Sequence, residues 1–119
     1  MSRSYRNNNP GNIVYGAFAK KYGATLEDGD NPRFGKFSSA AKGVLALVAL
    51  LSGLSYINLS IQDAIARYAP SNENDTKAYI KAVCDDAAIS PLAEICYLDA
   101  FKFIDLVTAI IKHEGYKKD

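Results

Sequence analysis

The chain has 119 residues, of which 49% are apolar and 23% are charged, an ordinary balance for one globular domain that covers residues 1–119. Its formal net charge is +1, so it lacks the excess of positive charge with which proteins neutralise nucleic acids or anionic lipids. The longest purely apolar run, residues 44–51, is far too short to cross a bilayer. We therefore expect no nucleic-acid partner and no membrane insertion.

The N-terminal third of the chain, residues 3–37, is rich in asparagine, glycine and aromatic residues and predicts a small lobe of loops or a β-hairpin. Residues 9–12 read Asn-Pro-Gly-Asn, which is a turn signal because proline fixes φ and glycine accepts a positive φ. Residues 17–22 predict one or two helical turns closed by Gly23. Residues 33–37 alternate polar and larger apolar side chains, as a short strand does.

The rest of the chain, residues 38–114, predicts helices. Ser38 or Ser39 can cap a helix that runs to about Ser52, and its residues 44–51 are apolar on every side, so we expect it to be a buried central helix. Polar capping residues or a Ser-Pro pair mark the starts of the segments that follow: Ser60, Asn74 or Asp75, Ser90 and Asp99. The expected fold is mainly α, with about five helices around the central one.

The end of the last helix carries the most informative acid. The expected inward face of this helix has apolar residues at helical spacing: Phe103, Ile104, Val107, Ile110 and Ile111. Glu114 continues that stripe at the negative end of the helix dipole, and both desolvation and the dipole disfavour its charged form. An acid that stays protonated near neutral pH is what glycosidic-bond cleavage needs from a general acid. The alternative is a solvated residue on a fraying C-terminus that pairs with Lys117 or Lys118.

Clustered amides in the N-terminal lobe are a second candidate feature. Their positions are Asn7, Asn8, Asn9 and Asn12. Side-chain amides both donate and accept hydrogen bonds, as binding of sugar hydroxyl and N-acetyl groups requires, but the same residues are common turn formers and helix caps. Cys84 and Cys96 are expected to be buried free thiols, with a disulfide as the alternative. With His113 as the single histidine, they argue against a metal site, and we expect no cofactor.

Four segments together resemble, in this order, small phage virion-associated and prophage structural proteins of the lysozyme-like superfamily: residues 6–13, 33–39, 68–80 and 110–114. Their layout is also similar to bacterial glucosaminidases of that superfamily. In those enzymes a helix ending in a catalytic glutamate is followed by an Asn-Asn loop, a strand, a buried helix and a Tyr-Ala segment. Here the loop corresponds to residues 8–13, the strand to residues 34–38, and the Tyr-Ala segment to residues 68–69, while the glutamate-bearing helix comes last.

The resemblance therefore implies a circularly permuted glucosaminidase or lytic transglycosylase domain that cleaves a β-1,4 bond in peptidoglycan glycan strands, with Glu114 as general acid. The residues that would hold the sugar are Asn8, Asn9, Asn12 and Tyr68. A permuted domain needs termini that lie close together, so we expect residues 7–12 to contact the last helical turn.

The identity of a second acid stays open. Hydrolysis calls for a second carboxylate, for which the candidates are Glu73, Glu27, Asp28 and Asp30. If Glu114 acts alone as acid and then as base, intramolecular transglycosylation to an anhydro sugar is the expected chemistry.

Two alternatives to an enzyme remain: a non-catalytic virion or secretion module that keeps the fold and binds glycan, and an unrelated helical interaction protein. The first nine residues have no apolar core and predict no secretory signal. We therefore expect a virion-associated protein, or one delivered to the periplasm or cell wall by another system. Its partners would be peptidoglycan and other virion or secretion-system proteins.

Overall fold

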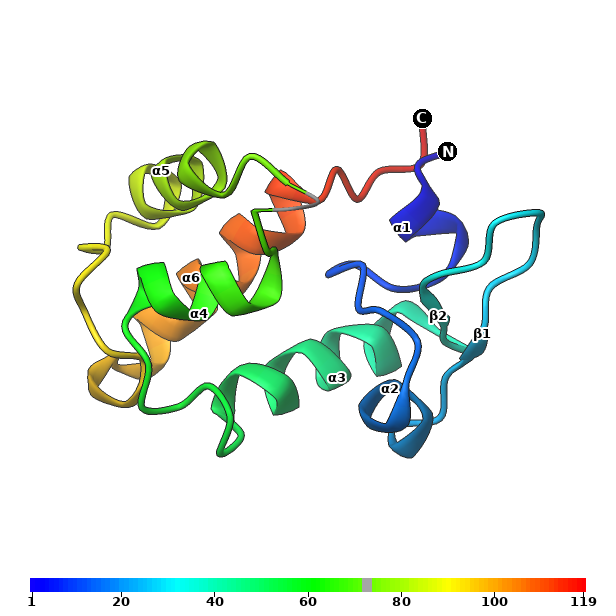
Figure 1. Cartoon of the computed structure of the whole chain (residues 1–119), viewed down its shortest axis with the longest axis horizontal. Coiled ribbons are helices and arrows are strands. Elements are labelled where there is room, and N and C mark those ends of the chain that lie inside the picture. Colours follow the sequence, from blue (N-terminus) through cyan, green and yellow to red (C-terminus); the bar gives the residue numbers. More distant parts are fainter. Residues whose placement is uncertain (72–73) are drawn as a thin grey trace. The chain divides into compact units, whose positions relative to one another are not determined.

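The structure, a computed structural model, describes residues 1–71 and 74–119 (Figure 1). In that part of the chain it has six α-helices, one 3-10 helix and one two-stranded antiparallel sheet, which confirms the expected mainly α fold with a small β element. The same residues contain no helix with both the length and the apolar character needed to cross a membrane.

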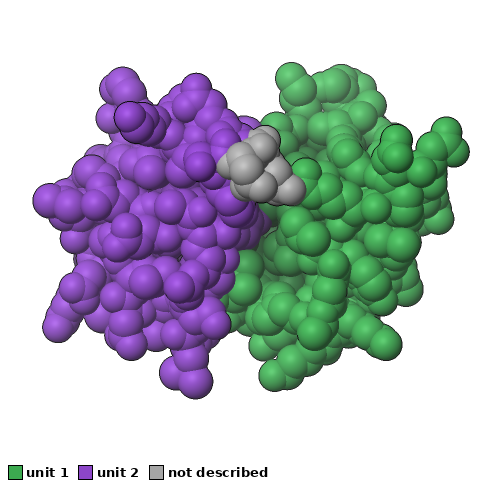
Figure 2. Space-filling view, in the orientation of Figure 1, with its two compact units in different colours: residues 1–50, 114–119 green, residues 51–113 purple. Residues whose placement is uncertain are grey.

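The chain divides into two compact units (Figure 2). Unit 1 comprises residues 1–50 and 114–119, and unit 2 comprises residues 51–113. Unit 1 therefore contains both ends of the chain. The interpretation of residues 1–119 as one domain stays a prediction.

Unit 1 begins with a short helix that the sequence pattern did not predict, α1 (Arg3–Arg6). The Ser2 side chain caps this helix by accepting a hydrogen bond from the backbone N–H of Tyr5 at 3.3 Å. Ser2 is also bonded to Lys117, far along the chain. A four-residue helix is too short to form alone, so these flanking contacts hold it in place.

The predicted helical turns and strand follow in unit 1. The helix is α2 (Ala17–Lys21), and Gly23 after it has φ +89°, as expected for a residue that ends a helix. Strand β1 (Thr25–Leu26) pairs antiparallel with β2 (Gly35–Lys36), which lies inside the predicted strand. The expected hairpin lobe is therefore confirmed.

Helix α3 (Ala40–Ser52) agrees with the predicted central helix in its bounds but not fully in its burial. Ser39 caps it by accepting a hydrogen bond from Lys42 N–H at 3.2 Å. Ala46 and Leu47 are fully buried, whereas 59% of Leu45 is exposed. The expectation that the helix is surrounded on every side was therefore wrong. Successive residues of a helix point about 100° apart, so a continuous apolar run reaches the outer surface as well as the core.

Besides the end of α3, the described part of unit 2 contains three α-helices and a 3-10 helix: α4 (Ile61–Tyr68), α5 (Thr76–Ala87), η1 (Ile95–Tyr97) and α6 (Ala100–His113). The predicted caps of the three helices are confirmed. Ser60, Asp75 and Asp99 each accept a backbone N–H three residues later, at 3.2, 3.1 and 2.8 Å. These short-range bonds explain why the helix starts can be read from the sequence.

The core of unit 2 forms where α5 packs on α4 and α6. Val107 and Ile110 of α6 are buried as expected, but 59% of Ile104 is exposed, and Leu106 is buried in its place. The inward face of α6 is therefore rotated from the expected one. The cysteines are both free: Cys84 is buried, and burial raises the pKa of its thiol, whereas Cys96 is exposed, against expectation.

Candidate functional site

Glu114 lies directly after the end of α6, within unit 1. Its carboxylate Oε1 accepts a hydrogen bond from Asn12 Nδ2 at 3.0 Å. The side chain is partly exposed, and the next residue, Gly115, has φ +70°, a left-handed conformation that favours glycine. This hydrogen bond confirms the contact between the asparagine loop and residue 114 that the resemblance led us to expect. The two residues are 102 positions apart in the sequence.

The two ends of the chain lie side by side in unit 1 (Figure 1). Ser2 N–H donates to the carbonyl oxygen of Lys117, and Lys117 N–H donates to Ser2 Oγ, both at 3.0 Å. The rings of Tyr5 and Tyr116 are in contact, with centroids 5.3 Å apart. The closeness of the termini that a permuted domain needs is confirmed, whereas distant termini would have favoured an unrelated helical protein.

The asparagine loop is a tight turn that packs on α3. Asn12 N–H donates to the carbonyl oxygen of Asn9 at 2.9 Å, and Asn8 and Asn12 both have φ +50°, which asparagine tolerates better than most residues. A methyl group added at Gly43 of α3 would overlap the carbonyl oxygen of Asn8 and lie 2.8 Å from Pro10 Cδ. Glycine at position 43 is therefore what allows the loop to lie against the helix.

The predicted sugar-binding asparagines differ in how their amides are used. Asn9 is fully buried: its Nδ2 donates to the carbonyl oxygens of Ile13 and Gly35, and its Oδ1 accepts from Ile13 N–H, each at 2.9 Å. This amide fastens the turn to β2, and both of its polar atoms are bonded to backbone groups. Asn8 is partly exposed, and its Nδ2 donates to the carbonyl oxygen of Phe37 at 3.0 Å.

Asn12 differs from Asn9 because one of its polar atoms is unpaired. Its Nδ2 donates to Glu114, but its buried Oδ1 has no hydrogen-bond partner among the residues that the structure describes. A buried acceptor without a partner costs about 1–3 kcal/mol, so such atoms are uncommon and often occur at functional sites. Asn12 therefore combines a donor that contacts the acid with a buried acceptor that has no partner among the described residues.

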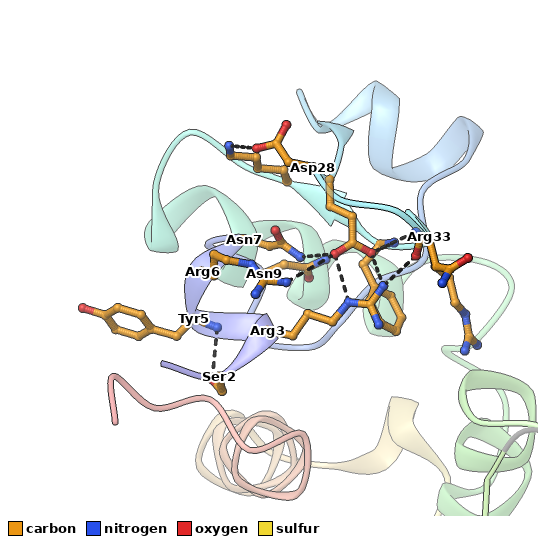
Figure 3. Close-up of polar contacts among 12 residues, drawn as sticks. Ser2, Arg3, Tyr5, Arg6, Asn7, Asn9, Asp28 and Arg33 are labelled. Atoms are coloured by element: carbon orange, nitrogen blue, oxygen red, sulfur yellow. Dashed lines mark hydrogen bonds and ion pairs between the residues drawn. The ribbon is translucent and has the colours of Figure 1, made fainter.

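Glu27 is a buried acid of unit 1, and Figure 3 labels three residues that contact it: Arg3, Asn7 and Arg33. Arg3 donates to both carboxylate oxygens, at 2.9 and 2.5 Å, and Asn7 Nδ2 donates at 3.0 Å. The backbone N–H groups of Arg33 and Phe34 donate at 2.8 Å each. The hydrogen bond from Arg3 is the largest cause that holds the pKa of the Glu27 carboxyl well below its usual range. Glu27 therefore stays charged and ties α1 to the hairpin.

The sequence pattern placed Glu27 among the candidates for a second acid but did not reveal this structural role. Arg3 and Glu27 are 24 positions apart, and no local motif connects them. Of the other loop acids, Asp28 is exposed and pairs with Lys36 at 2.7 Å, which lowers the pKa of Asp28, and Asp30 is exposed.

Tyr68 and Glu73 are the other two predicted site residues. Tyr68 is the last residue of α4 in unit 2 and is partly exposed. Glu73 lies outside the described residues. Within residues 1–71 and 74–119, no three histidine, cysteine, aspartate or glutamate side chains come together in a group that could hold a metal ion. The structure thus brings Asn8, Asn9, Asn12 and Glu114 together in unit 1.

Comparison with known proteins gives one informative similarity. No family model matches the chain. The chain is 35% identical over 95 residues to Protein P5 of Pseudoalteromonas phage PM2, an alignment that covers 74% of this chain and 57% of the phage protein. The chain thus spans little more than half the length of that relative. This similarity supports the phage association that the sequence motifs indicate.

Proposed function

We propose that the protein cleaves the glycan strands of peptidoglycan, with Glu114 as the general acid, as part of a phage-associated function. The observation that carries the proposal is the hydrogen bond between Asn12 and Glu114, because it joins the acid to the amide loop that the resemblance assigns to the same site. The adjacent chain ends support the permuted arrangement on which this assignment depends.

In the proposed reaction, neutral Glu114 donates its proton to the oxygen of the leaving sugar as the bond from that oxygen to the anomeric carbon breaks. The Nδ2 group of Asn12 holds the carboxyl group in place, and a sugar N–H or O–H group that reaches the buried Oδ1 of Asn12 would give that atom the partner it lacks. Asn8, which is partly exposed, contributes the second amide of the sugar site.

The nucleophile decides between two products. In hydrolysis, water attacks the anomeric carbon and gives up its proton to a carboxylate. In transglycosylation, the hydroxyl on C6 of the same sugar attacks and returns its proton to Glu114, which gives a 1,6-anhydro sugar. Because Glu27 is committed to Arg3, the candidates for a second carboxylate are Glu73, Asp28 and Asp30. The mass of the product distinguishes the two reactions, since an anhydro end lacks one water.

A turbidity assay on permeabilised bacterial cells tests the proposal. The wild-type protein should clear the suspension, and Glu114→Gln should not, because an amide cannot donate the required proton. Glu94→Gln is the matched control: Glu94 is exposed and belongs to unit 2, so this variant should clear the suspension at the wild-type rate. Clearing by Glu114→Gln would contradict the proposal. Binding to cell walls without clearing by the wild type would instead support a non-catalytic glycan-binding module.

A further inference from the structure

Residues near the two chain ends form a small set of contacts in unit 1, which we call the terminal clasp: Ser2, Tyr5, Tyr116 and Lys117. The Ser2 hydroxyl donates to the carbonyl oxygen of Lys117 and accepts from Lys117 N–H, both at 3.0 Å. The same oxygen caps α1 by accepting from Tyr5 N–H at 3.3 Å. Tyr5 and Tyr116 add the ring contact. One serine and one ring pair therefore connect the first helix to the tail.

We propose that the terminal clasp positions Glu114 for proton transfer, with Tyr116 as the main positioning residue; this inference rests on the proposed function. Glu114 follows the end of α6, where backbone carbonyls lack helical partners and chains tend to fray. Gly115 adds conformational freedom at the next position. The clasp fixes the backbone again at residues 116 and 117, which limits the movement of Glu114 between α6 and the tail.

The clasp also fixes the partner of the acid. Ser2 caps α1, and α1 leads directly into the asparagine loop that ends at Asn12. Arg3 of the same helix is anchored to the buried carboxylate of Glu27. The tail and the loop are therefore both joined to α1, and we infer that the 3.0 Å contact between Asn12 Nδ2 and Glu114 Oε1 depends on both connections.

Tyr116 can be tested with a pair of substitutions that separate its ring from its hydroxyl. Tyr116→Ala removes the ring contact with Tyr5, whereas Tyr116→Phe keeps it. Tyr97→Ala is the matched control, because Tyr97 is 83% exposed and lies in unit 2. We expect Tyr116→Ala to lower kcat for glycan cleavage by about 10- to 100-fold with little change in KM, since a small misplacement of a catalytic group has effects of that size. Tyr116→Phe and Tyr97→Ala should retain the wild-type kcat.

A second readout does not depend on activity. The side-chain amide of Asn12 gives a pair of proton–nitrogen NMR signals, which are assigned by their loss in Asn12→Asp. In Tyr116→Ala these signals should move towards their positions in Glu114→Ala, and in Tyr116→Phe they should stay at the wild-type positions. The fully bonded amide of Asn9 is the internal control and should not move.

Unchanged Asn12 signals and unchanged kcat in Tyr116→Ala would overturn the inference, as would a Phe variant that behaves like the Ala variant. If Tyr116→Ala fails to fold, Ser2→Ala tests the same clasp by removing the hydroxyl bonds to Lys117, with the same expected changes. If the wild type cleaves no glycan, the proposed function fails, and the NMR signals still decide whether the clasp holds Asn12 and Glu114 together.

Discussion

Glu27 and Glu114 are both acids of unit 1, and their surroundings suit them to different tasks. Glu27 is buried and receives hydrogen bonds from Arg3, Asn7 and two backbone N–H groups, all of which favour its charged form. Glu114 is partly exposed, and its carboxylate accepts a hydrogen bond from the Asn12 side-chain amide. The surroundings of Glu27 suit a structural ion pair, whereas Glu114 is the acid of the proposed reaction.

Glu27→Gln should lower the free energy of unfolding at neutral pH by about 1.5–3 kcal/mol, because it removes the charge that accepts the hydrogen bonds at the buried Glu27 carboxylate, while the Arg3 side chain remains 42% exposed to water. Because the pKa of Glu27 in the folded protein lies below its ordinary value of 4.5, the unfolded chain takes up the proton first as pH falls. The stabilisation is therefore present above about pH 4.5 and declines below it as the pH approaches the folded pKa.

Urea unfolding of the wild type and Glu27→Gln across this pH range measures both effects. The difference between the two proteins should shrink as the pH falls below 4.5. Asp28→Asn is the control, since Asp28 is exposed and its substitution should leave stability nearly unchanged. A constant difference at all pH values would show that the charge of Glu27 is not what stabilises unit 1.

The role of a single residue could be predicted from the sequence only where it follows from neighbouring residues. The asparagine cluster and Glu114 stand out by composition and by position in a helix, and the structure brings Asn12 and Glu114 together. The different roles of the asparagines were not predictable, because Asn9 bonds to Gly35, 26 positions away. The role of Glu27 depends on Arg3 in the same way.

Among the elements, the starts of α4, α5 and α6 were predictable, whereas the segment expected to start at Ser90 becomes a 3-10 helix only at Ile95, and buried faces were less predictable than helix starts. A cap such as Ser60 is a bond between residues three positions apart, so the sequence contains both partners. The burial of a helix face depends on what packs against it, and the exposure of Leu45 and Ile104 shows the resulting errors. Helix α1 was missed because its four residues are held by Ser2 and the distant tail rather than by a helical pattern.

A methyl group at Gly43 of α3 would overlap the asparagine loop, so Gly43→Ala should disturb the loop. Alanine favours a helix over glycine by about 1 kcal/mol, but overpacking typically costs about 1–3 kcal/mol, and the atom met here is a main-chain oxygen that cannot move aside easily. We expect a net loss of thermal stability and shifted NMR signals for residues 8–12. Gly16→Ala is the control because its methyl group would have no atom within 4 Å, and it should have the smaller effect.

Leu47 is the test of the α3 core. Leu47→Ala should cost about 2–5 kcal/mol through lost transfer free energy and the cavity left behind, because Leu47 is fully buried. Leu45→Ala on the same helix, at a side chain that is 59% exposed, should cost much less. Chemical denaturation of the two variants gives the comparison. Equal losses of stability would mean that the buried face of α3 has been assigned wrongly.

At the scale of the whole molecule, the interpretation as a permuted domain depends on the order of the elements along the chain more than on any single motif. The chain ends meet in unit 1, and Glu114, placed after the last helix, lies beside a loop that follows the first. The similarity to a phage protein agrees with the class of protein that the motifs indicate. Chain order and closeness of the termini were predictable from the sequence through the resemblance, whereas the clasp that joins the termini was not.

The most direct test of the proposed acid is the release of soluble muropeptides from purified bacterial cell walls, measured by mass spectrometry for the wild type and Glu114→Gln. The Gln variant keeps the size of the side chain, so its melting temperature should be close to that of the wild type, which shows that any loss of activity is chemical. We predict that the wild type releases fragments of glycan strand and that Glu114→Gln releases none. Equal release by a folded Glu114→Gln variant, or no release by the wild type, would contradict the assignment of Glu114 as the general acid of a peptidoglycan-cleaving protein.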